Sequence, residues 1–204
     1  MKITQSKWFV PGVIVGVIVL IALILGGTYN GLVQDREKVR TAFSNVQTQY
    51  QRRADLIPNL VNTVKGVSDF EQETLTDIVE ARSKATGVNV DADNPEQVQQ
   101  FVQAQQEVSG ALSRLLVVVE NYPTLKASEA YRDLIAQLEG TENRIQVARA
   151  DYNETARPYN ARIQTFPTNL VAGLFGFSRM EPFTADEGSD QAPTVDFNTG
   201  DGAE

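Results

Sequence analysis

The chain has 204 residues and a formal net charge of −8, and it contains neither cysteine nor histidine. These absences exclude disulfides, thiolate nucleophiles, the usual zinc sites and imidazole acid–base catalysis. Seven acidic residues follow the last basic residue, Arg179, so residues 1–180 have a net charge of only −1. A nearly neutral body without a basic stripe argues against a nucleic-acid partner.

An uncharged stretch, WFVPGVIVGVIVLIALIL, runs from Trp8 to Leu25 after a short N-terminal segment of residues 1–7. Together with the next weakly polar turn it provides about 20 residues, enough to cross a bilayer, so we predict a transmembrane helix over residues 8–29. Trp8 stands where an interfacial aromatic residue is expected. A cleaved signal peptide is the alternative, but the sequence LILGGTYNG offers no good small-x-small cleavage site. We therefore expect a single-pass protein of the cell membrane, with the lipid bilayer as one partner.

The side of the membrane that the remaining chain occupies stays open at this point. Basic residues flank both ends of the apolar stretch, namely Lys2, Lys7, Arg36, Lys38 and Arg40. The positive-inside rule therefore favours neither orientation. A GxxxG motif at Gly12 and Gly16 could pair two membrane helices, although glycine is common in such helices for other reasons.

Beyond Tyr29 the apolar residues follow a seven-residue repeat, which is typical of helices that pack at shallow angles. We predict an all-α fold in which the N-terminal transmembrane helix is followed by an elongated antiparallel up-and-down four-helix bundle over residues 30–165. The expected helices cover about residues 30–65, 69–86, 95–121 and 128–163. Short connections favour antiparallel neighbours, and no strand pattern competes.

Helix starts and one irregularity are also visible in the sequence. A serine or aspartate in the sequence SD at 68–69 can cap the second helix, Asn94 followed by Pro95 the third, and Ser128 the fourth. Pro58 lies inside the first helix and removes a backbone donor. We therefore expect a kink or break near Asp55, whose side chain could cap a restarted turn.

Two segments follow the predicted bundle. Residues 166–178 form an apolar, membrane-proximal segment whose first twelve residues, FPTNLVAGLFGF, carry no charge, and we expect them either on the membrane or against the base of the bundle. Residues 179–204 form an acidic tail without helical period that we expect to be disordered. The candidate membrane-proximal side chains are Trp8, Phe166, Leu170, Leu174, Phe175 and Phe177.

Two charged residues, Glu142 and Arg149, fall on the apolar seam of the fourth predicted helix. If residues 30 and 163 lie at the same height, antiparallel helices place Glu142 opposite Arg53. We predict that Arg53 and Glu142 form a buried ion pair that fixes the register of the bundle, because an unpaired buried charge is costly. Arg149 needs another partner, and Glu107 or Glu71 are the candidates.

The alternative interpretation of these polar residues is a pocket for a small ligand. It would be lined by Arg53, Glu142, Arg149, Tyr152 and Asn153. Charged residues on a bundle seam more often fix register than bind ligands. Di-metal sites in bundles require Glu-x-x-His pairs, and a chain without histidine cannot provide them. We predict no metal, no cofactor and no catalytic residue.

Two stretches resemble the LemA family of prokaryotic membrane proteins: RRADLIPNLVNTVKG at 52–66 and LEGTENRIQVARADYNETARPYNARIQTFPTNLVAGLFGF at 138–177. The resemblance covers roughly residues 8–177. It implies an antiparallel four-helix bundle behind one membrane helix, and it supplies no catalytic residue. It draws attention to residues within the two stretches, namely Arg53, Asp55, Pro58, Asn59, Leu60, Glu142, Asn143, Arg144, Arg149, Tyr152, Asn153, Tyr159, Asn160, Phe166, Pro167 and Asn169. Pro158 stands where a helix former is expected, so the last two turns of the helix predicted over residues 128–163 need not be straight.

The leading hypothesis is a membrane-anchored scaffold or adaptor that binds another protein, or a second copy of itself, on a bundle face or through its tail, without catalytic activity. The alternative is a sensory or small-ligand-binding bundle that relays binding to the anchor. A third class, an enzyme that uses carboxylates alone, has no motif to support it.

Overall fold

The computed structural model describes residues 9–66 and 71–184, and within these ranges the chain is helical and has no strand. The helices are α1 (Phe9–Lys65), α2 (Gln72–Gly87), α3 (Pro95–Val119), α4 (Pro123–Lys126), α5 (Glu129–Gln164) and α6 (Thr168–Phe175). The all-α prediction is confirmed for this part of the chain. Trp8 and the proposed cap at residues 68–69 lie outside the described residues.

The predicted membrane helix and the first body helix form one continuous element. α1 has 57 residues and is therefore about 86 Å long. Residues 10–27, which we call the apolar arm, are exposed, whereas Leu32 and the residues beyond it begin to pack against other helices. The most apolar 18-residue window of α1 has a mean hydropathy of 2.7 and none of it is buried. The apolar arm is long and apolar enough to cross a membrane.

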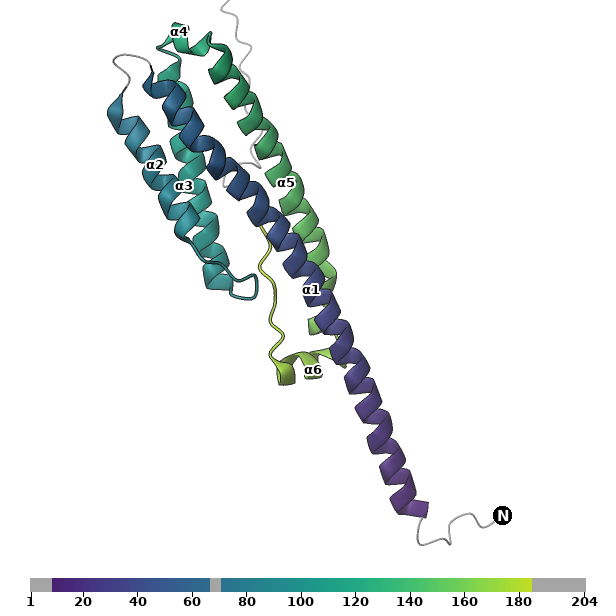
Figure 1. The fold of residues 1–204 in the computed structure, drawn as a ribbon. Coiled ribbons are helices and arrows are strands. Elements are labelled where there is room, and N and C mark those ends of the chain that lie inside the picture. The colour runs from purple at the N-terminus through teal and green to yellow at the C-terminus, as the bar shows by residue number, and fades with distance from the viewer. Residues whose placement is uncertain (1–8, 67–70, 185–204) are drawn as a thin grey trace, which may run out of the picture.

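The four longest helices pack as two neighbouring pairs (Figure 1). α1 lies along α5, and α2 lies along α3 and also touches α1. The short α4 connects the end of α3 to α5, while α6 contacts both α1 and α5. Because α2 and α3 are shorter, α1 and α5 extend past them toward the apolar arm. The side chain of Asn94 caps α3 by accepting from the backbone N–H groups of Glu96 and Gln97, and Ser128 caps α5 in the same way through Tyr131.

The buried apolar residues fall into two clusters along the long axis of this helical body. The cluster nearer the arm includes Leu32, Val39, Phe43, Val46, Tyr50, Phe101, Ile145, Tyr152 and Tyr159. The far cluster includes Ile57, Leu60, Val64, Leu75, Ile78, Val108, Leu115, Tyr131 and Leu138. Arg53, Gln105 and Thr141 are the buried polar residues among the described positions, and each falls in sequence near the boundary between the two clusters. A polar layer thus separates two apolar cores.

Pro58 does not break α1, because another helix satisfies the carbonyl group that proline leaves unpaired. A proline at position 58 cannot donate to the oxygen of Ala54, four residues earlier. Arg82 of α2 donates its Nε–H to that oxygen at 2.7 Å. The break expected near Asp55 is therefore wrong, and Asp55 accepts a hydrogen bond from Gln51 instead of capping a turn. α5 likewise continues through Pro158 to Gln164.

This arrangement gives a first testable prediction. Arg82→Met should lower the free energy of unfolding by about 1–3 kcal/mol, because the half-buried oxygen of Ala54 loses its donor. In a Pro58→Ala background, residue 58 regains an N–H that can reach Ala54, so Arg82→Met should cost roughly 1 kcal/mol or less. Thermal unfolding of the four proteins, followed by circular dichroism in detergent, measures both values. Equal costs in the two backgrounds would contradict the explanation.

Candidate functional site

The polar layer is built around the side chain of Arg53, which is 3% exposed. Its Nη1 donates to Ser109 Oγ at 2.9 Å and to Glu142 Oε2 at 3.0 Å. Its Nη2 donates to the main-chain oxygen of Gln105 at 3.0 Å and to Oε1 of the same residue at 2.9 Å. The structure therefore brings Arg53 and Glu142 together, as the antiparallel geometry predicted. The Glu142 side chain is 44% exposed, however, so only one member of the pair is buried.

A shallow cleft of about 280 Å³ opens beside this ion pair, between α1, α3 and α5. Arg53 and Glu142 line it together with polar and apolar side chains of α3 and α5, namely Ser109, Leu112, Ser113, Leu116, Ile135, Leu138 and Glu139. This cleft is where a small ligand would meet the polar layer.

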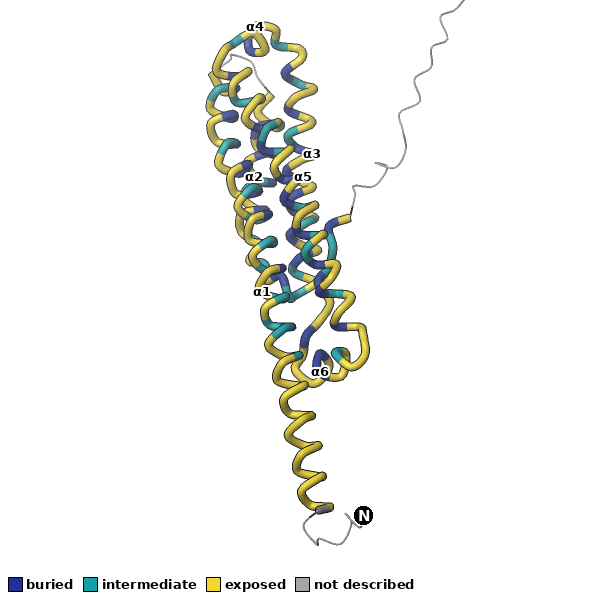
Figure 2. The backbone as a smooth tube through the Cα atoms, turned by 90° about the vertical axis from the view of Figure 1, so that its right-hand side faces the viewer, coloured by how far each residue is buried: buried dark blue, intermediate teal, exposed yellow. Residues whose placement is uncertain are grey.

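A second arrangement, on the part of α5 nearer the arm, involves residues that follow α6. Residues 177–184, which we call the strap, leave α6 after Gly176, whose φ of 71° is the left-handed conformation that glycine adopts readily. The strap then runs back along α5, antiparallel to it, as an irregular segment (Figure 1). Every third position of this segment, at 177, 180 and 183, is buried, and the positions between them are exposed or half-buried (Figure 2). The strap therefore forms part of the packed body.

Five side chains of α5 hold the strap, and all seven of their hydrogen bonds go to main-chain atoms. Asn160 donates to the oxygen of Met180 at 2.9 Å and accepts from its N–H at 2.8 Å. Asn153 donates to the oxygen of Phe183 at 2.8 Å and accepts from its N–H at 2.9 Å. The remaining bonds run from Tyr159 to Ser178 at 3.0 Å, from Tyr152 to Glu181 at 2.9 Å and from Arg149 to Thr184 at 2.6 Å.

The spacing of the two asparagines matches the repeat of an extended chain. Asn153 and Asn160 are seven residues apart on a helix, which corresponds to about 10.5 Å. Met180 and Phe183 are three residues apart, which in an extended chain corresponds to about 10 Å. Each Tyr-Asn pair of α5 therefore meets the next three residues of the strap. These hydrogen bonds do not depend on the identity of the strap's side chains, because they involve only its main-chain atoms.

Apolar side chains at every third position provide the side-chain specificity of the strap. Phe177, Met180 and Phe183 are buried, and Met180 is completely inaccessible. The ring of Phe183 lies 5.2 Å from that of Tyr152 and 6.1 Å from that of Phe43, measured between centroids. These contacts make the strap part of the cluster nearer the arm. The body would expose that apolar surface if the strap left.

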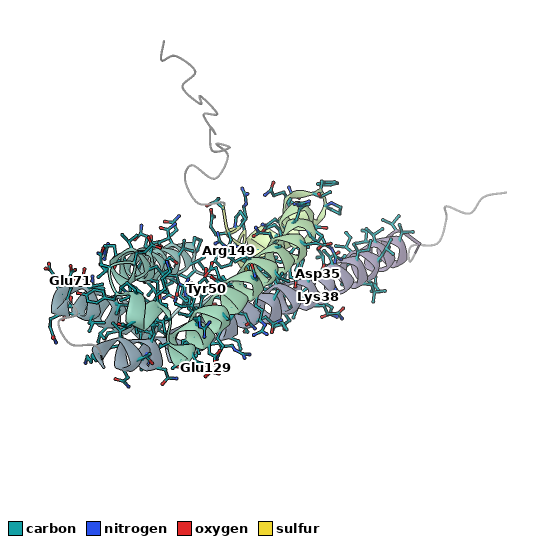
Figure 3. The ribbon with its side chains drawn as sticks, turned by 90° about the horizontal axis from the view of Figure 1, so that it is seen from above. Asp35, Lys38, Tyr50, Glu71, Glu129 and Arg149 are labelled. Carbon is teal, nitrogen blue, oxygen red and sulfur yellow. The ribbon has the colours of Figure 1, made fainter. Side chains whose placement is uncertain are left out.

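The structure corrects two expectations about this region. Arg149 pairs with neither Glu71 nor Glu107, since its guanidinium bonds the oxygen of Thr184 and lies 5.4 Å from the ring centroid of Phe183. Glu71 lies toward the opposite end of the body from the arm, well away from Arg149 (Figure 3), and Glu107 pairs with Lys84. The expected disorder from residue 179 onward is wrong for residues 179–184, and the rest of the acidic tail lies outside the described residues.

The other predicted residues are spread over the molecule. Asp55 and Asn59 are exposed on α1 and do not join the polar layer or the strap contacts. Arg149, Tyr152, Asn153, Tyr159 and Asn160, which the sequence offered without a common role, all bind the strap. Met180 and Phe183 were missed. They could have been recognised from the apolar residues at every third position that begin at Phe177 and continue into the acidic region.

No metal site is evident in the described ranges, where no three acidic side chains gather closely enough to hold an ion. Two of the ionisable groups that contact the strap are phenols, those of Tyr152 and Tyr159. Burial raises the pKa of Tyr152, and the carboxylates of Glu181 and Asp93 add to this effect. Burial and Asp93 also raise the pKa of Tyr159, although Arg36 and Arg40 act in the opposite direction.

These shifts predict a loss of stability in alkali. A phenol ionises near pH 10 in the unfolded chain, whereas Tyr152 and Tyr159 keep their protons to a higher pH in the folded chain. Below about pH 10 both states are protonated and the contribution to stability is constant. Above it the unfolded state loses protons first, so the melting temperature should fall as pH rises. Tyr152→Phe should make this fall shallower between about pH 9.5 and 11.5, and an unchanged slope would contradict the prediction.

Comparison with known proteins identifies the family of this chain. The model of the LemA family matches residues 42–197, which include both the polar layer and the strap. Protein LemA of Metamycoplasma hominis is 30% identical over 161 residues, covering 79% of this chain and 71% of that protein. Magnetosome protein MamQ 2 of Paramagnetospirillum magneticum is 29% identical over 191 residues, covering 83% and 69%. MamQ of Magnetospirillum gryphiswaldense is 25% identical over 174 residues, covering 76% and 64%. With more than half of its length matched by one family model, this membrane-associated helical chain belongs to the LemA family.

Proposed function

We propose that this chain is a single-pass membrane scaffold or adaptor without catalytic activity. In this proposal residues 8–29 cross the cell membrane, and α1, α2, α3 and α5 act as one elongated up-and-down four-helix bundle beside it. The exposed apolar arm supports the membrane span, because a soluble protein rarely exposes so long an apolar surface. The absence of histidine and cysteine from the sequence removes the commonest catalytic groups.

The strap is the observation that carries the adaptor role. Its end, Thr184, is bound by Arg149 on the flank of α5, so the chain continues from a fixed point on the body. Six acidic residues follow among residues 185–204. An adaptor that offers an acidic sequence from a fixed position suits a partner protein with a basic surface, because complementary charge favours fast and specific encounter.

Crosslinking in native membranes tests this role. A photo-crosslinking amino acid is placed in the full chain at exposed apolar positions of the body, Val79, Val117 and Val147, or in the acidic tail at Phe197. Mass spectrometry should then recover one stoichiometric protein partner or a second copy of the chain. A matched variant carries amides in place of the six acidic residues, and it should lose only those contacts that depend on the tail. Repeated failure at all four positions would contradict the proposal.

The second candidate function is a small-ligand sensor, and the cleft beside Arg53 and Glu142 favours it. A ligand bound there should raise the melting temperature of the full chain in detergent. Ser113 lines the same cleft and is itself exposed, so Ser113→Trp should obstruct the site with little loss of stability. A stabilising compound whose effect survives Ser113→Trp would argue against this site. Arg149 cannot serve for this test, since it binds the strap and does not line the cleft.

A further inference from the structure

The end of the body nearest the arm carries an exposed apolar surface that the fold itself does not cover. Phe166, Leu170, Leu174 and Phe175, which we call the α6 face, are 76%, 63%, 75% and 52% exposed. They belong to residues 166–177, which contain no charged residue. Monomeric soluble proteins rarely group so many large apolar side chains at one exposed site.

Helical geometry divides α6 into a buried side and an exposed side, both of them apolar. Leu170 and Leu174 are four residues apart and therefore share one side of α6. Val171 and Ala172, on the other side, are buried against the body. α6 is thus fixed on one side by α1 and α5, whereas Leu170 and Leu174 on its other side are largely exposed.

The position of α6 coincides with the boundary of the apolar arm. The ring of Tyr29 lies 4.8 Å from that of Phe175 and 5.7 Å from that of Phe177, measured between centroids. In Figure 1 α6 runs across the direction of α1 at this level, and in Figure 2 α1 is entirely exposed beyond it. If the arm crosses the bilayer, α6 therefore lies along the membrane surface, at the depth where tyrosine is commonly found.

Three of the charged residues just above this level, Asp35, Lys38 and Arg162, are paired with one another. Asp35 accepts hydrogen bonds from Lys38 at 2.9 Å and from Arg162 at 2.6 Å. Although burial acts in the other direction, these two cations lower the pKa of Asp35 and keep it ionised. The guanidinium of Arg162 also covers Gly31, where a Cβ atom would come within 2.5 Å of its Nη2. Lys38 and Arg162 are thus engaged with a carboxylate, whereas Arg36 lies 4.9 Å from the ring centroid of Phe177. The α6 face itself carries no charge, so apolar contact is its main attraction to lipid.

We propose that the α6 face is a second membrane contact, in which Phe166, Leu170 and Leu174 enter the boundary between headgroups and acyl chains. A contact that runs across the direction of the arm would restrict the tilt and rotation of the body relative to the bilayer. The proposal rests on the membrane span of the proposed function. It predicts insertion into neutral lipid, because burial of apolar area and not anionic charge drives it.

Site-specific fluorescence quenching tests the contact, and the absence of native cysteine makes single labels simple. Leu170→Cys and Leu174→Cys report on the α6 face, Leu23→Cys on the arm and Val147→Cys on the exposed flank of α5. Each full-length variant carries a polarity-sensitive dye in phosphatidylcholine vesicles that contain lipid with a nitroxide near the headgroup or deep in the acyl chain. We expect shallow nitroxides to quench residues 170 and 174 at least about threefold more than residue 147, and deep nitroxides to quench residue 23.

The outcomes separate this proposal from the one on which it rests. Quenching at residue 23, with residues 170 and 174 no more quenched than residue 147, would overturn the second contact and leave the span intact. Lack of quenching at residue 23 would remove the span as well. Quenching at residues 170 and 174 only when anionic lipid is added would overturn the apolar contact. Quenching there by a nitroxide-labelled second copy, but not by lipid, would identify the face as a self-association surface and also overturn it.

A loss-of-contact variant completes the test. With the dye at Phe166→Cys, the additional substitutions Leu170→Ser and Leu174→Ser should reduce lipid quenching at least about threefold. The matched change Val147→Ser, at another exposed apolar position, should leave it unchanged. Helical content measured by circular dichroism checks that the body is intact, and undiminished quenching in the double serine variant would overturn the proposal.

Discussion

Replacing Glu142 by alanine is expected to lower the free energy of unfolding by about 2–3 kcal/mol, which is roughly 5–10 °C in melting temperature for a chain of this size. The cost arises at Arg53, because its buried guanidinium keeps the neutral acceptors Ser109 and Gln105 but loses its carboxylate partner. A fully buried pair would cost more, about 3–5 kcal/mol. Here the exposed half of Glu142 already interacts with water.

The pair can be isolated by a double-mutant cycle. Arg53→Ala should also be strongly destabilising, since it leaves an unfilled space and removes four hydrogen bonds. Combined with Glu142→Ala it should cost roughly 1–3 kcal/mol less than the sum of the single changes, because neither charge is then left alone. Glu139→Ala, an exposed carboxylate on the same helix, is the control and should change stability by about 0.5 kcal/mol or less. Additive effects would show that the contact has no energetic role.

The position of this ion pair suggests that it fixes the alignment of the packed helices. An apolar core of similar helices tolerates sliding by one turn, since one apolar residue replaces another. The polar layer does not tolerate such sliding, because Arg53 meets its acceptors on α3 and α5 at only one alignment of the helices. A one-turn shift of α1 would move the cation toward the apolar residues of α3 and α5 in one of the two neighbouring clusters, away from its acceptors. We therefore regard register as the main contribution of the pair and stability as a secondary one.

The helices and their alignment could be predicted from the sequence because they depend on local or periodic signals. Apolar residues at steps of three and four define the seams, and the caps at Asn94 and Ser128 mark two helix starts. In antiparallel helices, residue numbers determine which residues lie at the same level along the long axis. Arg53 and Glu142 could therefore be matched from their numbers alone. The estimate required only that both helices be continuous.

The failures share a different cause, which is that main-chain groups carry no sequence signal. Pro58 correctly indicated an orphaned carbonyl, but the donor that satisfies it comes from Arg82, 28 residues away from Ala54. The partner of Arg149 was sought among carboxylates, whereas the structure uses the oxygen of Thr184. The strap was hidden because the density of acidic residues suggested disorder, whereas Met180 and Phe183 are buried and side chains of α5 bind the strap's main chain.

The strap provides the second large expected effect. Asn153→Ala and Asn160→Ala each remove two hydrogen bonds to one strap residue, which together contribute about 1–3 kcal/mol to holding it. The strap should then open about 10–100 times more often. Hydrogen exchange at the N–H groups of Met180 and Phe183, the two that these asparagines accept, measures the opening directly. Asn143→Ala, at an exposed position on the same helix, should leave both rates unchanged.

Conservative changes distinguish backbone recognition from simple packing. Asn153→Asp preserves the size of the side chain and can still accept from the N–H of Phe183. It replaces the amide N–H that donates to the carbonyl oxygen of Phe183 with a carboxylate oxygen, so two oxygens face each other. It should therefore release the strap at least as strongly as alanine does. Changes at the exposed strap residues Ser178 and Arg179 should have little effect, because the strap contributes only main-chain atoms there. Met180→Asp should open the strap completely, since no partner in the surrounding apolar cluster can accommodate a charge. If Asn153→Asp left exchange at Phe183 unchanged, the strap would be held by its apolar side chains alone.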